Sequence, residues 1–388
     1  MKKIKVLFLE DIGEIAGGPN SLLQLFSKIN KDVEIHIDAP DGSFVQKAKK
    51  YAHKITIREK IRYEQIKFLN ISIPNIYHLI IRFLDAFKIY KYTKKYKIDI
   101  VHSNDLDGHL TSWFLCHVFK LKVVWHIRIM TWPKILYKLP RVTKIIFVSD
   151  AVKKFSLENK SQKNVSVVYN GINYQDFILE QESSDRNILR KNYNIQDKEF
   201  VIGYVSRIKN QKRQKVIIES VLPLIKKGFN IKVIFVGDDS VTREVIGGKE
   251  SNYFSDLKEL CIKNNIVDNI IFTGHQKNTA PYYSIFDCFA FSAINDSNPR
   301  VILEAMTSKI PIIANNTGGV VNMLEDGEFG LLCEVDNVND FTNKIEMLLN
   351  NKEIINTEKT FKKLKRDFSL DVHSKNILSI YSNIIKQR

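Results

Sequence analysis

The chain has 388 residues, of which 44% are apolar and 26% are charged. These values are typical of a soluble globular protein and exclude disordered and collagen-like chains, and the length predicts two domains. No segment approaches the roughly 20 apolar residues that cross a bilayer. The apolar start Ile4–Leu9 ends at Glu10-Asp11, which is too short for a signal peptide, so we interpret it as a buried first strand.

The charge is positive and unevenly distributed. Of the net +16, residues 1–178 carry 30 Lys and Arg against 16 Asp and Glu, whereas residues 179–388 carry 29 against 27. This asymmetry indicates an anionic partner for the first half: phosphates, nucleic acid or an acidic lipid surface. A lysine-rich genome would explain the surplus but not its position. The four cysteines form no C-x-x-C pair, so we expect no zinc or redox site and a reducing cytoplasm.

Both halves alternate short Val- and Ile-rich runs with amphipathic stretches of helical length, a pattern that predicts parallel sheets covered by helices. The expected strands of the first half are Ile4–Leu9, Val33–Ile37, Ile100–His102, Val123–His126, Ile145–Val148 and Val165–Tyr169. Those of the second half are Val201–Val205, Lys232–Val236, Ile270–Thr273, Cys288–Phe291 and Pro311–Ala314.

A polar segment, Leu179–Arg186, lies between the two halves, and we interpret it as the interdomain linker. The sequence therefore predicts one domain over residues 1–178 and a second over 187–365, with a C-terminal helix over 366–388 that packs back toward the first domain. Because ligands of doubly wound α/β sheets bind at the carboxyl ends of the strands, function is expected in the strand-to-helix loops, facing a cleft between the domains.

Three such loops carry candidate binding groups. Gly17 and Gly18 follow the first strand and let a ligand approach the backbone at a helix start. Arg207 and Lys212 follow the first strand of the second half and supply fixed cations for a diphosphate. In the third loop Asp296 precedes a helix that contains Glu304, a carboxylate suited to the vicinal hydroxyls of a ribose, while the N–H groups of Val301 and Ile302 are expected to bind phosphate.

Together these motifs resemble the retaining glycosyltransferase family 4 (glycosyl transferases group 1), which has the GT-B fold of two Rossmann-like domains facing a central cleft. The resemblance covers nearly the whole chain. It is carried by the Gly17-Gly18 loop, Asp99-Ile100-Val101-His102, Val148-Ser149-Asp150-Ala151, Tyr169-Asn170-Gly171-Ile172-Asn173, Arg207 with Lys212, the E-x7-E-like pair Asp296 and Glu304, and Glu325–Leu332. Asp296 stands where the family has Glu, Ser206 replaces the usual Gly, and Pro299 stands where many members have Gly.

The resemblance implies transfer of a sugar from a nucleotide sugar, a UDP-sugar before GDP-mannose, with retention at the anomeric carbon. Arg207 and Lys212 would stabilise the leaving diphosphate, Asp296 would bind the transferred sugar, and Glu304 would bind the ribose. The other residues predicted to bind the donor are Gly17, Gly18, Val301 and Ile302. His126 would orient the sugar, although a strand-end histidine bonded to backbone is the alternative. We expect no metal and no cofactor, because the nucleotide sugar is a co-substrate and Asp105-Leu106-Asp107, which imitates a D-x-D metal motif, is interpreted as a solvated loop.

The expected acceptor is a growing glycan or a lipid-linked molecule in cell-surface polysaccharide synthesis, at the inner face of the cytoplasmic membrane. Residues 58–97, rich in Lys, Arg and aromatic residues, are predicted to contact that surface. Other functions remain open. The pI of 9.4 permits a nucleic-acid binder, although no zinc knuckle, helix-turn-helix or RNA-binding signature is present. A nicotinamide-dependent oxidoreductase is a further alternative, but this sequence lacks the G-x-G-x-x-G motif that binds such a cofactor. An epimerase or phosphorylase of the same fold is the remaining alternative.

Overall fold

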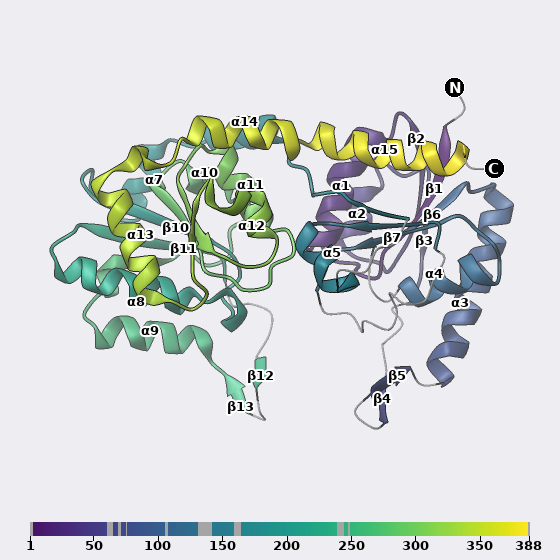
Figure 1. Cartoon of the computed structure of the whole chain (residues 1–388), viewed down its shortest axis with the longest axis horizontal. Coiled ribbons are helices and arrows are strands. Elements are labelled where there is room, and N and C mark those ends of the chain that lie inside the picture. The colour runs from purple at the N-terminus through teal and green to yellow at the C-terminus, as the bar shows by residue number, and fades with distance from the viewer. Residues whose placement is uncertain are drawn as a thin grey trace. The chain divides into compact units, whose positions relative to one another are not determined.

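The computed structural model describes residues 3–59, 65–68, 71–74, 76–104, 108–130, 142–158, 164–238, 244–246 and 249–386. The chain forms two compact units (Figure 1). Unit 1 consists of Met1–Gly171 together with Leu370–Arg388, and unit 2 consists of Ile172–Ser369. The last segment of the chain therefore belongs to the same unit as the first.

Unit 1 is built on a parallel sheet with the strand order β3-β2-β1-β6-β7-β8-β9. From β1 the chain first extends the sheet in one direction and then returns to extend it in the other, so the order reverses between β1 and β6. This is the topological switch point, where doubly wound sheets bind ligands. The strands are β1 (Ile4–Leu9), β2 (Val33–Ala39), β3 (Lys54–Ile57), β6 (Ile100–Ser103), β7 (Val123–Ile127), β8 (Lys144–Phe147) and β9 (Val165–Val167).

Side chains of unit 1 alternate between two core layers, because successive residues of a strand point to opposite faces. Val6 and Phe8 of β1 lie in one buried cluster, and Leu7 and Leu9 lie in the other. The first cluster is covered by α1 (Gly17–Ile29), α2 (Ser43–Ala48) and α15 (Leu370–Lys386). The second is covered by α3 (Ile76–Tyr96), α4 (Gly108–His117) and α5 (Asp150–Leu157).

Unit 2 repeats this plan with the parallel strand order β14-β11-β10-β15-β16-β17, and its switch point lies between β10 and β15. The strands are β10 (Phe200–Val205), β11 (Ile231–Val236), β14 (Ile270–Phe272), β15 (Cys288–Phe291), β16 (Ile312–Asn315) and β17 (Leu331–Cys333). The helices are α6 (Tyr174–Glu182), α7 (Arg186–Asn192), α8 (Gln214–Lys226), α9 (Tyr253–Lys263), α10 (Ala280–Tyr283), α11 (Arg300–Thr307), α12 (Gly319–Met323), α13 (Val338–Asn350) and α14 (Thr357–Asp367). The prediction of two doubly wound α/β sheets is confirmed.

The boundary between the units differs from the predicted one. The predicted linker Leu179–Arg186 lies within unit 2, where it forms the end of α6 and the start of α7. Phe177 of α6 packs edge-on against Tyr283 at 5.5 Å, and Asp185 caps α7. These polar residues thus form exposed helix ends, and the chain passes between the units at residues 171–172 and again at 369–370.

Two antiparallel strand pairs form small sheets of their own: β4 (Gln65–Phe68) pairs with β5 (Ile71–Pro74), and β12 (Glu244–Ile246) pairs with β13 (Lys249–Ser251). The D-x-D-like residues Asp105 and Asp107 lie outside the described residues. Among the helices that the structure describes, none has the length and hydropathy to cross a membrane.

Candidate functional site

Two predicted site residues meet across the switch point of unit 2. Lys212 lies in a 3-10 turn (Asn210–Lys212) after β10, and Asp296 lies in the loop after β15. The ammonium of Lys212 is 2.8 Å from Oδ2 of Asp296. Both side chains are about one-quarter exposed, at 27% and 24%. The pair therefore presents a cation and a carboxylate at the carboxyl edge of the sheet, where both are partly accessible to solvent.

The backbone of the Lys212 turn is fixed from below by buried hydroxyls. The Tyr204 hydroxyl donates to the carbonyl oxygen of Lys212, and Ser292 Oγ donates to that oxygen at 3.2 Å and to the Arg213 carbonyl at 2.7 Å. Tyr204 and Ser292 are fully buried, and burial raises the pKa of the Tyr204 phenol, so it remains a donor at neutral pH. The position of the Lys212 side chain thus depends on strands β10 and β15.

The Asp296 loop rests on the turn that precedes α12, and this contact requires glycine. Gly318 has φ +62°, and a Cβ there would lie 2.4 Å from the Asp296 carbonyl oxygen. A Cβ on Gly319 would lie 2.0 Å from the carbonyl oxygen of Ser297, and the Gly319 N–H donates to the Asp296 carbonyl at 2.9 Å. The paired glycines therefore support the loop that carries Asp296.

Arg207 is exposed, in the loop directly after β10. The loop itself is ordered by Gln214 of α8, whose amide donates to Ser206 Oγ at 3.0 Å and to the Arg207 carbonyl at 2.9 Å. Ser206, which replaces a glycine of the family pattern, thus contributes a hydrogen bond to the loop. Gly237 packs against it so closely that a Cβ would lie 2.1 Å from the Ser206 carbonyl oxygen.

Glu304 lies half-buried on α11 and accepts a hydrogen bond of 2.9 Å from the hydroxyl of buried Tyr283. Burial raises the pKa of Glu304, while the charge of Arg300 one turn earlier and the Tyr283 hydrogen bond lower it. Burial likewise lowers the pKa of Arg300, and Glu304 offsets this effect. A buried carboxylate without partners destabilises the fold. Tyr283 and Arg300 are the partners of the Glu304 carboxylate.

The first turn of α11 contains two further predicted donor-binding residues, Val301 and Ile302. Pro299 lies at the N-cap position with φ −70°. Ile302 is buried, and its N–H donates to the Pro299 carbonyl at 3.2 Å, so this group already has a partner within the turn. Val301 is half-buried. Its N–H is therefore the better candidate of the two for binding a phosphate oxygen.

The switch point of unit 1 is occupied by a network of buried polar side chains. Glu10 follows β1 and Asn104 follows β6, and the Asn104 amide donates to Glu10 Oε2 at 2.6 Å. Arg128, after β7, donates to Asn104 Oδ1 at 2.6 Å and to Asn170 Oδ1 at 2.7 Å. Glu10, Asn104 and Asn170 are buried, whereas Arg128 is half-buried. Arg128 thus connects the ends of several strands.

His126 is fully buried at the end of β7 and belongs to this network. Its Nδ1 lies 3.3 Å from Nη2 of Arg128 and 3.3 Å from Nε2 of His102, and His102 Nδ1 lies 2.7 Å from the hydroxyl of Tyr381 on α15. Because a guanidinium only donates, His126 Nδ1 accepts and its proton is on Nε2. Neutral His102 then donates from Nε2 and accepts from Tyr381. His126 thus forms hydrogen bonds with other side chains, which differs from the alternative of a strand-end histidine bonded to backbone.

Gly17 and Gly18 begin α1 next to this network. A Cβ on Gly17 would meet nothing within 4 Å, and one on Gly18 would be 3.5 Å from Cδ of Arg128, an ordinary contact. In contrast, a Cβ on Gly13 would lie 2.3 Å from the Asp41 carbonyl oxygen. Within the described residues, Gly13 is therefore required by packing, whereas Gly17 borders open space, as a ligand-facing glycine would.

Two family profiles match this chain. The family described as "Glycosyl transferases group 1" matches residues 185–367, and the family described as "Glycosyltransferase Family 4" matches residues 26–176. The chain belongs to the group 1 glycosyltransferases of family 4. The profile boundaries place the ends of β10 and β15 in the first match and those of β6 and β7 in the second.

Relatives of this glycosyltransferase are distant in sequence and close in fold. The capsular polysaccharide biosynthesis glycosyltransferase CapM of Staphylococcus aureus is 26% identical over 267 residues, which cover 65% of this chain and 66% of CapM. A glycosyltransferase structure from Rickettsia africae aligns over 100% of both chains with a TM-score of 0.83 and 19% identity. Anabaena HepE in complex with UDP aligns over 98% of this chain and 100% of its own, with a TM-score of 0.78 and 17% identity.

The structure thus brings together Lys212 with Asp296 and places Arg207 in the same loop as Lys212. It also reveals residues that the sequence did not identify. Tyr283 has no motif of its own, and Glu10, Asn104 and Tyr381 come from three separate segments. Asn170 belongs to a motif that the sequence showed, but its bond to Arg128 did not follow from that motif. A buried polar group at a strand end is a useful signal, but only the fold shows which such groups meet.

Proposed function

We propose that this glycosyltransferase moves a sugar from a UDP-sugar to a growing glycan or lipid-linked acceptor in cell-surface polysaccharide synthesis, with retention at the anomeric carbon. The observation that carries the proposal is the Lys212–Asp296 pair across the switch point of unit 2, 2.8 Å apart, beside exposed Arg207. Similar proteins support it: HepE forms complexes with UDP and with UDP-glucose, and CapM acts in capsular polysaccharide biosynthesis.

In this proposal the diphosphate binds to Lys212 and Arg207. A departing nucleoside diphosphate gains negative charge as its bond to the sugar breaks, and fixed cations stabilise that charge more in the transition state than in the ground state. These two side chains take the role that a divalent metal has in other nucleotide-sugar transferases. Activity that persists in a chelator such as EDTA is therefore expected, and a chelated enzyme that is still folded but inactive until Mg²⁺ or Mn²⁺ is added would contradict this assignment.

The acceptor hydroxyl attacks the anomeric carbon from the face that the diphosphate leaves. The carbon–oxygen bond to the diphosphate breaks, the bond to the acceptor oxygen forms, and the acceptor proton moves to the departing diphosphate oxygen. No covalent sugar–protein intermediate is needed, so the protein chiefly positions the reactants. The anomeric configuration of the product, measured by NMR, tests this step: an inverted product would overturn it.

Glu304 and Asp296 are proposed to bind hydroxyls of the donor. Tyr283 occupies one oxygen of Glu304 at 2.9 Å, and the carboxylate can accept further hydrogen bonds from the ribose. Asp296 already pairs with Lys212, so the sugar-binding carboxylate and the phosphate-binding cation are coupled. Asp296 is one methylene shorter than the Glu of the family, yet it reaches Lys212 from its loop. We expect the preference for the donor sugar to depend on the length of this side chain.

The donor site is tested by thermal-shift assays with UDP, GDP, UDP-glucose and GDP-mannose. We expect a UDP-sugar to raise the unfolding midpoint of the wild type. Arg207→Ala and Glu304→Gln should each abolish that shift with a similar midpoint in the absence of ligand, and Lys215→Ala, which changes an exposed lysine of α8, should retain it. If both site variants respond to the donor like the wild type, the site assignment is wrong.

The proposed membrane contact rests on α3. Its side chains Ile80, Phe83, Leu84 and Phe87 recur at helical spacing, and 53%, 39%, 52% and 40% of their respective surfaces are exposed. Exposed lysines follow toward the C-terminal end of this helix, at positions 88, 91, 94 and 95. An apolar face flanked by lysines suits the interface of an anionic bilayer. Part of the predicted segment, including residues 60–64, lies outside the described residues.

Vesicle flotation tests this contact. Wild-type protein should float with vesicles that contain anionic lipid and less with neutral vesicles. Replacing Ile80 and Leu84 by Ser should reduce flotation, whereas Ile262→Ser, at a similarly exposed apolar residue of unit 2, should not. Equal failure of the wild type with both kinds of vesicle would exclude a lipid-surface role.

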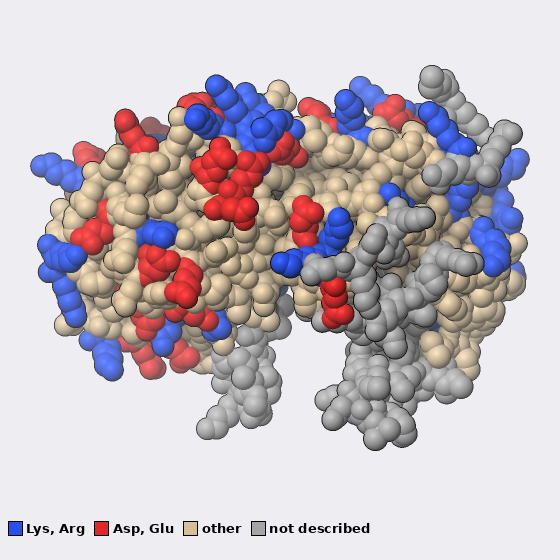
Figure 2. Space-filling view, viewed as in Figure 1, with Lys and Arg blue, Asp and Glu red and all other residues tan. Residues whose placement is uncertain are grey.

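The alternative function of nucleic-acid binding receives little support from unit 2. Figure 2 shows Lys and Arg side chains gathered over α14, with acidic side chains beside them. Lys363 pairs with Glu325 and with Asp367 at 3.0 Å, and Arg366 lies 2.7 Å from Asp367. These basic residues are thus compensated locally, unlike a basic surface that binds nucleic acid.

A further inference from the structure

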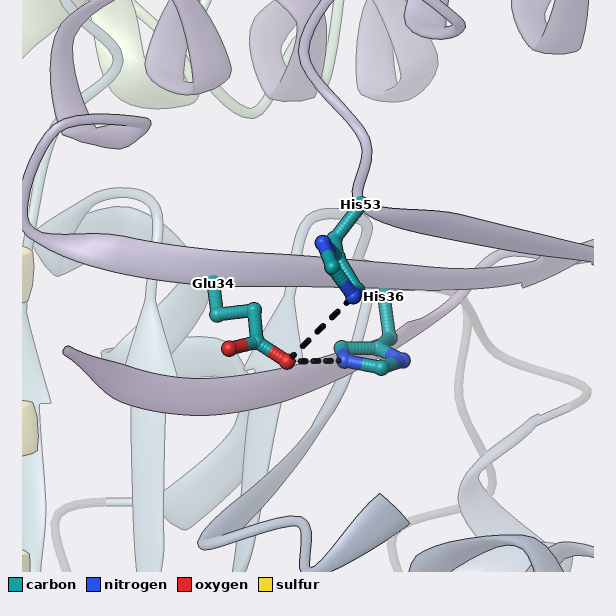
Figure 3. A group of neighbouring side chains, drawn as sticks. All are labelled: Glu34, His36 and His53. Carbon is teal, nitrogen blue, oxygen red and sulfur yellow. Dashed lines mark hydrogen bonds and ion pairs between the residues drawn. The ribbon is translucent and has the colours of Figure 1, made fainter.

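A cluster of imidazole and carboxylate groups lies in unit 1, away from the loops discussed above. Glu34 and His36 lie on the same face of β2, and His53 precedes β3 (Figure 3). Nε2 of His36 is 3.0 Å from Oε1 of Glu34, and Nε2 of His53 is 3.8 Å from the same oxygen. Glu34 is the second residue of β2, so the cluster lies toward the amino end of this strand, whereas Gly17 and Arg128 lie beyond the carboxyl ends of β1 and β7.

We propose that Glu34, His36 and His53 form a binding site for a Zn²⁺-like transition-metal ion. One ligand atom from each residue lies within 4.8 Å of the other two. Tetrahedral zinc with bonds of about 2.0–2.1 Å needs ligand atoms about 3.4 Å apart, which small side-chain rotations reach from these positions. Two imidazoles and one carboxylate suit Zn²⁺ or Co²⁺, whereas Mg²⁺ and Ca²⁺ prefer oxygen ligands only.

The surroundings hold the ligands in place. The N–H of His53 donates to the Ile35 carbonyl at 2.7 Å, which fixes the turn before β3 against β2. Nδ1 of His36 lies 2.8 Å from the hydroxyl of Tyr92 on α3, and this contact orients the ring with Nε2 toward Glu34. Such a hydrogen bond to the second imidazole nitrogen is the usual outer-shell support of a metal-bound histidine.

Exposure defines where the ion enters. The His36 side chain is fully buried, Glu34 is 20% exposed and His53 is 63% exposed. The ion therefore reaches the cluster from the His53 side, where a water molecule completes four-coordination. The metal would link β2, the turn before β3 and, through Tyr92, α3, so its expected effect is on the stability of unit 1. The inference does not depend on the proposed sugar transfer.

Lys5 competes with the metal. Its ammonium lies 2.9 Å from the same Glu34 oxygen that faces the histidines. A bound dication repels this ammonium, so Lys5 must turn away or move to the second carboxylate oxygen. The cost of displacing Lys5 thus lowers the affinity of the wild type for the metal. Removing the charge of Lys5 should therefore raise the metal affinity, whereas removing a ligand should lower it.

The test is titration of chelator-treated, full-length protein with ZnCl₂ by calorimetry, and with CoCl₂ by visible absorption, which reports four-coordinate Co²⁺. We expect one equivalent to bind, with no competition from Mg²⁺. His53→Gln and Glu34→Gln should weaken binding at least about tenfold. His275→Gln, at an exposed histidine of unit 2, should bind like the wild type.

Lys5→Met keeps the aliphatic stem, removes the competing charge, and should bind Zn²⁺ more tightly than the wild type. Zn²⁺ should also raise the unfolding midpoint of the wild type but not of His53→Gln. Equal affinity of the wild type and His53→Gln would overturn the proposal, as would the absence of binding in both the wild type and Lys5→Met. Binding by Lys5→Met that is no tighter would overturn the proposed competition.

Discussion

The two sheets present their switch points in different ways. In unit 1 the side chains at this edge are mostly buried and bonded to one another, from Glu10 through Asn104 to Arg128. In unit 2 the corresponding edge carries the partly exposed Lys212–Asp296 pair beside exposed Arg207. The same strand order therefore supports a preorganised polar network in one unit and accessible charge in the other.

This difference indicates which substitutions should alter chemistry and which should alter stability. A partly exposed ion pair contributes little to folding, because water screens it and solvates its members when they separate. A buried network is costly to disrupt, because each lost partner leaves a desolvated polar group. We therefore expect unit 2 variants at the pair to lose activity while staying folded, and unit 1 network variants to lose stability.

The largest expected effect is that of Lys212→Ala. Removal of a cation from the departing diphosphate should lower kcat by about 10²–10³-fold, as for other groups that stabilise transition-state charge. The unfolding midpoint should change little, since the lysine is 27% exposed. Steady-state kinetics with the identified donor and acceptor, together with thermal unfolding, measure both. If Lys212→Ala lowers the unfolding midpoint but leaves kcat unchanged, the pair in unit 2 serves stability rather than chemistry, contrary to our expectation.

A glycine pair sharpens the comparison. Gly318→Ala should destabilise unit 2 by about 1–3 kcal/mol, because its φ is +62° and the new Cβ would collide with the Asp296 carbonyl. Gly17→Ala should leave the unfolding free energy nearly unchanged, since the Cβ meets nothing within 4 Å, yet it should weaken binding of any ligand that approaches there. Chemical denaturation of both variants decides this, and equal destabilisation would contradict the contrast.

The smallest expected effect is that of Tyr381→Phe. It removes one hydrogen bond to His102, so unit 1 should lose about 0.5–1.5 kcal/mol. The ¹⁵N NMR signals of the His126 imidazole should show the Nε2–H tautomer in both the wild type and the variant, because Arg128 still donates to Nδ1. The signals of His102 should change from the Nε2–H tautomer to a mixture, because Tyr381 no longer donates to its Nδ1. A wild-type signal from the Nδ1–H tautomer would disprove the deduced hydrogen-bond direction.

Much of the fold could be predicted because buried parallel strands leave a strong local signal. Ile4–Leu9 and Cys288–Phe291 were predicted with the bounds that the structure has. The edge strand Lys54–Ile57 was not expected, since its side chains are partly exposed and its apolar run is short. The linker was misplaced because a polar segment can equally form an exposed helix end, and only Phe177 packing on Tyr283 distinguishes the two.

The site was predictable where chemistry and position in the chain coincide. Arg207, Lys212 and Asp296 each lie in the segment that connects a strand to the next helix, and the loops that carry them meet at the switch point of unit 2. The partner of Glu304 was not predictable, because Tyr283 lies on another helix with no pattern to mark it. The same holds for the Glu34, His36 and His53 cluster: cysteine spacing suggested no zinc site, and the three residues come from β2 and from the turn before β3.

The return of the chain to unit 1 has a consequence for biosynthesis. Ile377, Tyr381 and Ile384 of α15 belong to the core that Val6 and Phe8 begin. On the ribosome, the N-terminal sheet must wait with that core uncovered until all of residues 172–369 have emerged, whereas unit 2 has its whole sequence available earlier. A released chain that ends at residue 369 would thus contain the complete sequence of unit 2 but a unit 1 without α15, whose core stays uncovered.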